Sequence, residues 1–112
     1  MKLEYHLRID SEHPAELDRI LGVGSRGPGG GWQIVRREGP TDPPVAFVDE
    51  FLSVLDGKYE ALEGLGINRD RITMWVLYEY DQQCNLEFNP DALKRLGNNG
   101  ISLCVSCWQA PD

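Results

Sequence analysis

Two short segments of the chain share one residue pattern, and each lies between two segments typical of β-strands. Both have a proline, a leucine three residues later, an arginine two residues after that, and then an aliphatic residue, over 14–20 and 90–96. Proline in a first turn, followed by apolar residues at three- and four-residue spacing, favours an α-helix. We therefore interpret the chain as a strand–helix–strand unit that is used twice.

Four segments have the composition of β-strands. Residues 3–9 alternate strictly, with apolar side chains at odd positions and polar side chains at even positions, as in a strand with one buried face. Residues 71–80 are rich in β-branched and aromatic types. Residues 32–37 and 101–108 complete the set, and 84–88 could add a brief extension. The six glycines within 22–31 predict a loop.

The strongest helical periodicity lies between the two units, over 47–55, and it continues after Gly57. We expect a helix of about 12 residues that Asp56 and Gly57 end or bend, with a shorter helix behind it. The predicted fold class is α+β, with a ferredoxin-like pair of β-α-β units. It would have a four-stranded antiparallel sheet with helices on one face and the long helix inserted between the halves. Residues 1–112 form a single domain.

Charge and cysteine content restrict the partners and the compartment. Eighteen acidic residues against eleven basic ones give a net charge of −7, which disfavours binding to nucleic acid or to anionic membranes. No run of ~18 apolar residues could span a membrane, and the N-terminus carries charges where a secretory signal needs an apolar run. Three cysteines do not suggest a disulfide scaffold. These features predict a cytoplasmic protein.

Two motifs resemble cofactor sites but lack the required context. Gly22–Gly27 matches G-x-G-x-x-G, yet a helix precedes it and no strand feeds the glycine turn, so we interpret it as a connector. Cys104 and Cys107 form a C-x-x-C pair inside a predicted strand, where their thiols would point to opposite faces. Cys107 would then lie in the core. The sequence offers no second C-x-x-C pair for zinc.

Catalytic chemistry finds little support in the remaining residues. A cysteine–histidine pair would need Cys104 and His6 on neighbouring strands, which the ferredoxin-like order does not promise. The acidic residues Asp49, Glu50, Glu60 and Glu63 are typical of the solvated side of amphipathic helices. We therefore predict no catalytic residue, no metal ligand and no cofactor, and the chain is not expected to be an enzyme.

The second face of the predicted sheet is more apolar than a wetted surface needs. It would carry His6, Arg8, Thr73, Trp75, Leu77, Ser102, Cys104, Ser106 and Trp108. Three alternatives are open: the central helix covers this face, a second copy of the chain covers it, or it binds a ligand or partner. The candidate binding residues are His6, Arg8, Trp75, Leu77 and Trp108, with the tryptophans as anchors of an interface.

The order of these features resembles the bacterial domain of unknown function 4279 family. The most specific stretch runs from Leu86 through Asn89-Pro90 to Gly97 and on into the last strand. The first half contributes an alternating strand, a Pro-x-x-Leu helix that ends in Leu-Gly, a glycine loop before Trp32 and a long helix. The loop at 24–29 departs from the family pattern. The resemblance implies a small cytoplasmic bacterial domain and supplies no catalytic residues or cofactor.

These observations favour a non-enzymatic protein-interaction module. Small acidic domains of this kind also resemble immunity proteins of bacterial toxin systems. The partner of this chain would be another protein, or a second copy of the chain in a homodimer. The alternative is a small-ligand-binding domain or an enzyme, with a pocket on the second sheet face around His6, Arg8, Trp75 and Cys104.

Overall fold

In the described part of the chain, five strands form one open mixed sheet in the order β2–β3–β1–β4–β5. The computed structural model describes residues 2–111. The strands are β1 (Lys2–Ile9), β2 (Ser25–Arg26), β3 (Trp32–Glu38), β4 (Ile72–Tyr80) and β5 (Ser102–Gln109). β1 pairs antiparallel with both β3 and β4, whereas β4 and β5 are parallel. The four long strands were predicted from the sequence. The extension at 84–88 is not a strand, and the glycine loop contains the short β2.

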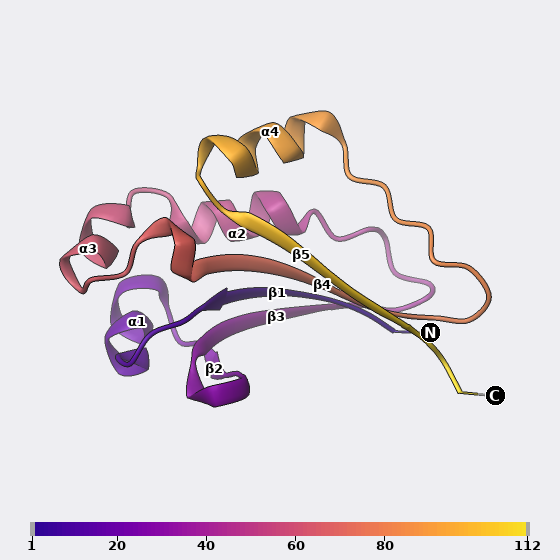
Figure 1. Ribbon diagram of the computed structural model, residues 1–112, viewed down its shortest axis with the longest axis horizontal. Helices are drawn as coiled ribbons and strands as arrows, with labels where there is room; N and C mark the ends of the chain where they lie inside the picture. The colour runs from indigo at the N-terminus through magenta and orange to yellow at the C-terminus, as the bar shows by residue number, and fades with distance from the viewer. Residues whose placement is uncertain (1, 112) are drawn as a thin grey trace.

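Among the described residues, four α-helices cover one face of the sheet. They are α1 (Pro14–Leu21), α2 (Phe47–Leu55), α3 (Tyr59–Gly64) and α4 (Pro90–Asn98), and two 3-10 turns lie at Pro28–Gly30 (η1) and Arg69–Arg71 (η2). α2 and α4 lie above the strands in Figure 1, and α1 and α3 lie toward one end of the sheet. The core forms between this helical layer and the side chains of β1, β3 and β4 that face it. The structure is therefore a two-layer α+β domain.

The two repeated segments are both helical and lie on the same face, but they are not equivalent. Leu17 of α1 is fully buried, whereas its counterpart Leu93 of α4 is 46% exposed. α1 lies at the end of the sheet where β1 stops, so the chain turns back into an antiparallel neighbour (Figure 1). α4 instead follows a segment that returns along the sheet, so β5 runs parallel to β4. The four-stranded antiparallel sheet of a ferredoxin-like fold is therefore not confirmed.

The break in the central helical region was predicted correctly, but the first helix is shorter than expected. α2 has nine residues, and Asp56 and Gly57 separate it from α3. α2 packs on the helical side of the sheet, where the ring of Phe47 stacks on that of Tyr5 with centroids 4.5 Å apart. Phe51 and Leu55 are also buried there. The alternative in which this helix covers the second sheet face is therefore wrong.

The glycine loop between α1 and β3 is held in place by one carboxylate. Asp18 accepts hydrogen bonds from the backbone N–H of Gly24 (3.0 Å), from Nε1 of Trp32 (3.1 Å) and from the guanidinium of Arg26 (2.8 Å). The Arg26 hydrogen bond, and then that of Gly24, lower the pKa of Asp18 to about 2. The loop is thus attached to α1, where the sequence suggested only a connector.

No helix within residues 2–111 is long and apolar enough to cross a membrane.

Asp18→Asn is expected to lower stability at neutral pH but not in strong acid. The folded state holds the pKa of Asp18 below its ordinary value of 3.8, so the ionised form stabilises the fold above about pH 4. That contribution is lost as the pH falls toward 2. Urea unfolding at several pH values would measure it, and the stability difference from wild type should shrink between about pH 4 and pH 2. Arg26→Gln should reduce the same pH dependence, and a pH-independent difference would contradict the assignment.

Candidate functional site

Within residues 2–111, no helix lies on one face of the sheet, and the side chains of this face come from alternate positions of four strands. We call this surface the open face. Its residues are Lys2, Glu4, His6, Arg8, Gln33, Val35, Arg37, Thr73, Trp75, Leu77, Glu79, Ser102, Cys104, Ser106 and Trp108. All five candidate binding residues predicted from the sequence belong to it.

The register places the open-face side chains in rows across the strands. Val35, His6, Trp75 and Cys104 form one row, in the strand order β3–β1–β4–β5. Directly opposed side chains on one sheet face approach to about 5 Å, so His6 and Trp75 are neighbours on this face. Cys104 lies beyond it, because β4 separates β1 from β5. His6 and Cys104 are therefore not on neighbouring strands, as a cysteine–histidine pair would require.

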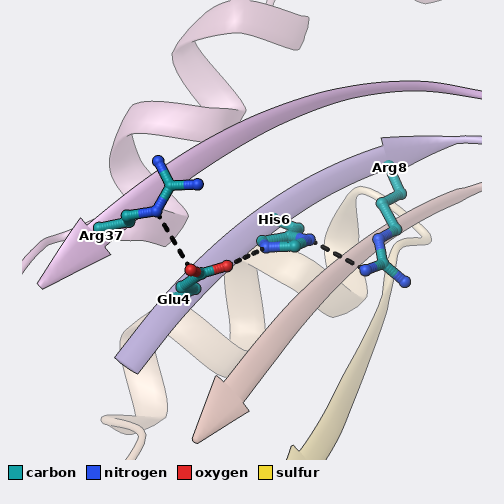
Figure 2. Close-up of polar contacts among 4 residues, drawn as sticks. All are labelled: Glu4, His6, Arg8 and Arg37. Carbon is teal, nitrogen blue, oxygen red and sulfur yellow. Dashed lines mark hydrogen bonds and ion pairs between the residues drawn. The ribbon is translucent and has the colours of Figure 1, made fainter. Parts of the chain in front are cut away.

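A chain of hydrogen bonds runs along the β1 side of the open face (Figure 2). Arg37 donates from Nε to Glu4 at 3.1 Å, and Nε2 of His6 lies 2.9 Å from the other oxygen of Glu4. Nη2 of Arg8 lies 3.0 Å from Nδ1 of His6. A guanidinium can only donate, so Nδ1 accepts and the ring proton is on Nε2, which donates to Glu4. This arrangement uses the neutral form of His6.

The same chain of hydrogen bonds also positions the ring of Trp75, through Arg8. The guanidinium carbon of Arg8 lies 4.9 Å from the centroid of the Trp75 ring, which is a cation–π contact. His6 is only 6% exposed although no helix covers it, because its neighbours on the sheet surround it. The hydrogen bond from His6 and the charge of Arg37 lower the pKa of Glu4 against the opposing effect of burial, so Glu4 is ionised at neutral pH. His6, Arg8 and Trp75 therefore form one ordered cluster.

The other two candidate residues lie toward the opposite end of the open face. Leu77 is half-buried and sits between Glu4 and Ser106 in the register. Trp108 is 42% exposed, and its Nε1 donates to Glu79 at 3.3 Å. They do not share a row with Trp75. The face thus has an ordered polar–aromatic cluster at one end and a more exposed apolar region at the other.

A cavity of about 460 Å³ lies where the open face meets the glycine loop. Arg8, Gln33 and Thr73 line it from the sheet, and Gly27 and Arg71 are among the residues that complete its wall. Nε of Arg8 and Oε1 of Gln33 are buried without a hydrogen-bond partner among residues 2–111. Neither tryptophan of the open face lines this cavity. The sequence did not indicate it, because the loop and the sheet approach only in the folded chain.

The cysteines correct one sequence expectation and add a contact that was missed. Cys107 is exposed rather than in the core, although it points to the helical side as predicted. A hydrogen-bonding contact with Cys107 raises the pKa of Cys84, so these two thiols are neighbours. Cys104 is half-buried on the open face. In the part of the chain that the structure describes, no three His, Cys, Asp or Glu side chains are grouped so as to hold a metal ion.

No known protein family matches the sequence, and no curated protein or solved structure matches it either. The resemblance to the bacterial domain of unknown function 4279 family therefore stays a prediction. No residue role can be transferred from a relative. Function must be inferred from the open face and the cavity beside it.

Proposed function

We propose that this chain is a non-enzymatic protein-interaction domain that binds its partner through the open face. The observation that carries the proposal is that this face has no helical cover and presents Trp75, Leu77 and Trp108 in a polar surround. Tryptophan and arginine are enriched among the residues that dominate binding energy at protein interfaces. Arg8, stacked on Trp75, adds the second of these residue types.

The charges of the open face indicate the kind of partner. Lys2, Arg8 and Arg37 slightly outnumber Glu4 and Glu79 on the open face, so the acidic excess of the chain resides elsewhere on the molecule. The partner surface is therefore apolar and aromatic at its centre, and its rim need not be basic. A toxin neutralised by an immunity protein would be one partner of this kind.

The side-chain geometry supports binding better than catalysis. His6 has both ring nitrogens in hydrogen bonds with Glu4 and Arg8, so neither is free to move a substrate proton. Cys104, which shares a row with His6, lies beside Trp75 and not beside a base. The contacts of His6 and Arg8 therefore hold the side chains of this face in fixed positions, which suits a binding surface.

A second candidate function is small-ligand binding in the cavity beside the glycine loop. The observation in its favour is the pair of buried, unpartnered polar atoms on Arg8 and Gln33, which a ligand could satisfy. A ligand there would shift the backbone amide NMR signals of Gly27 and Arg71, which line the cavity. A protein on the open face would instead shift those of Leu77 and Ser106.

A photocrosslinking residue tests the proposed function directly. We would place p-benzoylphenylalanine at Leu77 on the open face and, as the matched control, at Leu93, which is exposed on α4 on the other side of the sheet. In cells that naturally make the protein, irradiation is expected to give an adduct with a different protein from Leu77 and none from Leu93. Trp108→Ser should lower the yield, since loss of a tryptophan anchor at an interface costs about 2 kcal/mol of binding.

The outcomes separate the alternatives. Equal adducts from both sites, or no protein adduct from Leu77, would contradict the proposal. An adduct only with the chain itself would show that the open face joins two copies.

A further inference from the structure

Strand β5 forms one edge of the sheet and lacks the features that normally protect an edge. Natural proteins blunt exposed edges with charged residues, prolines, bulges or very short strands. The opposite edge follows this rule, because β2 has only two residues and one of them is Arg26. β5 has eight residues and contains no charge and no proline. Val105 and Trp108 of β5 are 45% and 42% exposed.

The backbone of β5 also has hydrogen-bonding groups that face outward. The N–H of Ala110 donates to the carbonyl of Tyr80 on β4 at 2.7 Å, which sets the direction of the even-numbered residues toward β4. Strand alternation then directs the N–H and C=O groups of the odd-numbered residues, Leu103 to Gln109, away from the sheet. Within residues 2–111, no turn, loop or cap hydrogen bond uses these groups. They form a ready template for another strand.

We propose that a second copy of this chain pairs with β5 in antiparallel orientation, around a two-fold axis at Val105. Outward-facing residues must meet outward-facing residues, so odd positions oppose odd positions. Val105 then opposes Val105 of the second copy, and Leu103 opposes Cys107. On the open face, Trp108 lies across from Ser102 of the second copy. The two exposed apolar residues of β5 thus meet an apolar or a small neighbour.

A second copy fits this edge better than a charged partner strand. A strand without charged residues places no like charges opposite each other, although the whole chain carries −7. A two-fold interface is self-complementary, which the register centred on Val105 satisfies. Pairing would join the two sheets into one of twice the width, with both open faces on the same side. This inference does not depend on whether the open face binds anything.

Sedimentation equilibrium with two valine variants tests the proposal. Val105→Lys places two lysines opposite each other at the axis, whereas Val23→Lys adds the same charge in the loop, where Val23 is 89% exposed. Wild type and Val23→Lys are expected to have twice the chain mass of 12.6 kDa. Val105→Lys should raise the dimer dissociation constant about a hundredfold or more, because like charges at an interface cost several kcal/mol. Circular dichroism would confirm that each variant is folded.

Amide hydrogen exchange gives a second readout that reports the edge itself. In the dimer, the amides of Leu103, Val105 and Cys107 should be protected, and this protection should disappear on dilution or in Val105→Lys. A wild-type chain that stays monomeric at the highest attainable concentration would overturn the proposal. A dimer that survives Val105→Lys, or one without protection at these amides, would overturn it as well.

Discussion

Replacing Gly24 by alanine is expected to destabilise the domain by about 2–3 kcal/mol, the cost of forcing an extra group into a packed site. A Cβ at this position would lie 2.5 Å from Nε1 of Trp32 and 2.6 Å from the backbone carbonyl of Gln33. Trp32 is 1% exposed, so its ring cannot move aside without disturbing the core. The clash would also separate the Gly24 N–H from Asp18, which it now contacts at 3.0 Å.

Gly97→Ala is the matched control for this prediction. Gly97 lies in α4, and a Cβ there would meet nothing within 4 Å. Because alanine has a higher helix propensity than glycine, the free energy of unfolding of this variant should rise by up to about 1 kcal/mol. Urea unfolding of both variants beside wild type would measure the two effects. Equal stabilities for Gly24→Ala and wild type would contradict the packing argument.

The glycine motif shows what local sequence can and cannot predict. The neighbouring residues predicted that a helix and not a strand leads into Gly22–Gly27, and α1 does precede this segment. The need for glycine at position 24 has a different origin, since it depends on the Trp32 ring and on Gln33 across the loop. No spacing within 22–27 encodes that approach.

The face of each strand was predictable, but the neighbours of each strand were not. Alternation over residues 3–9 placed Tyr5, Leu7 and Ile9 on the buried side, and all three are buried. Alternation is a property of one strand, whereas strand order depends on the path of each connection. The repeated helical pattern suggested two equivalent connections, but they differ in the structure. α1 lies at one end of the sheet, whereas the chain runs back along the sheet before it forms α4.

The sequence also did not show which parts of the helical side of the sheet the helices cover, and at β5 they leave side chains exposed. Alternation assigned Val105 and Cys107 to the helical side, which the register confirms, yet both are exposed. An edge strand has a neighbour on one side only, so a residue on its buried face can remain uncovered. The same uncovered edge is the basis for the dimer proposed above.

The candidate site was predictable as a set of residues but not as a set of contacts. The sequence placed His6, Arg8 and Trp75 on one face, which the register confirms. It did not reveal that Glu4 and Arg37 continue the hydrogen-bonded chain, because Arg37 arrives from β3 and that pairing was unknown. The alternation that placed His6 on this face also placed Glu4 there, two residues away. The Glu4–His6 contact was therefore predictable from the sequence, whereas the Arg37–Glu4 contact was not.

His6→Ala is expected to lower the free energy of unfolding by about 2–3 kcal/mol, typical of breaking a buried hydrogen-bonded network. The ring of His6 links Glu4 to Arg8, and its loss would leave a gap beside Trp75 with Nη2 of Arg8 unpartnered. Arg8 would then be free to leave the Trp75 ring. Trp75 fluorescence should therefore change together with stability.

The chain supplies its own control, because its other histidine is exposed. His13 precedes α1 and makes no side-chain cap hydrogen bond, so His13→Ala should change stability by less than about 0.5 kcal/mol. His6→Gln should recover part of the loss, since a glutamine amide can donate to Glu4 and accept from Arg8. Urea unfolding would rank the three variants. Similar effects for His6→Ala and His13→Ala would show that the hydrogen-bonded chain does not stabilise the open face.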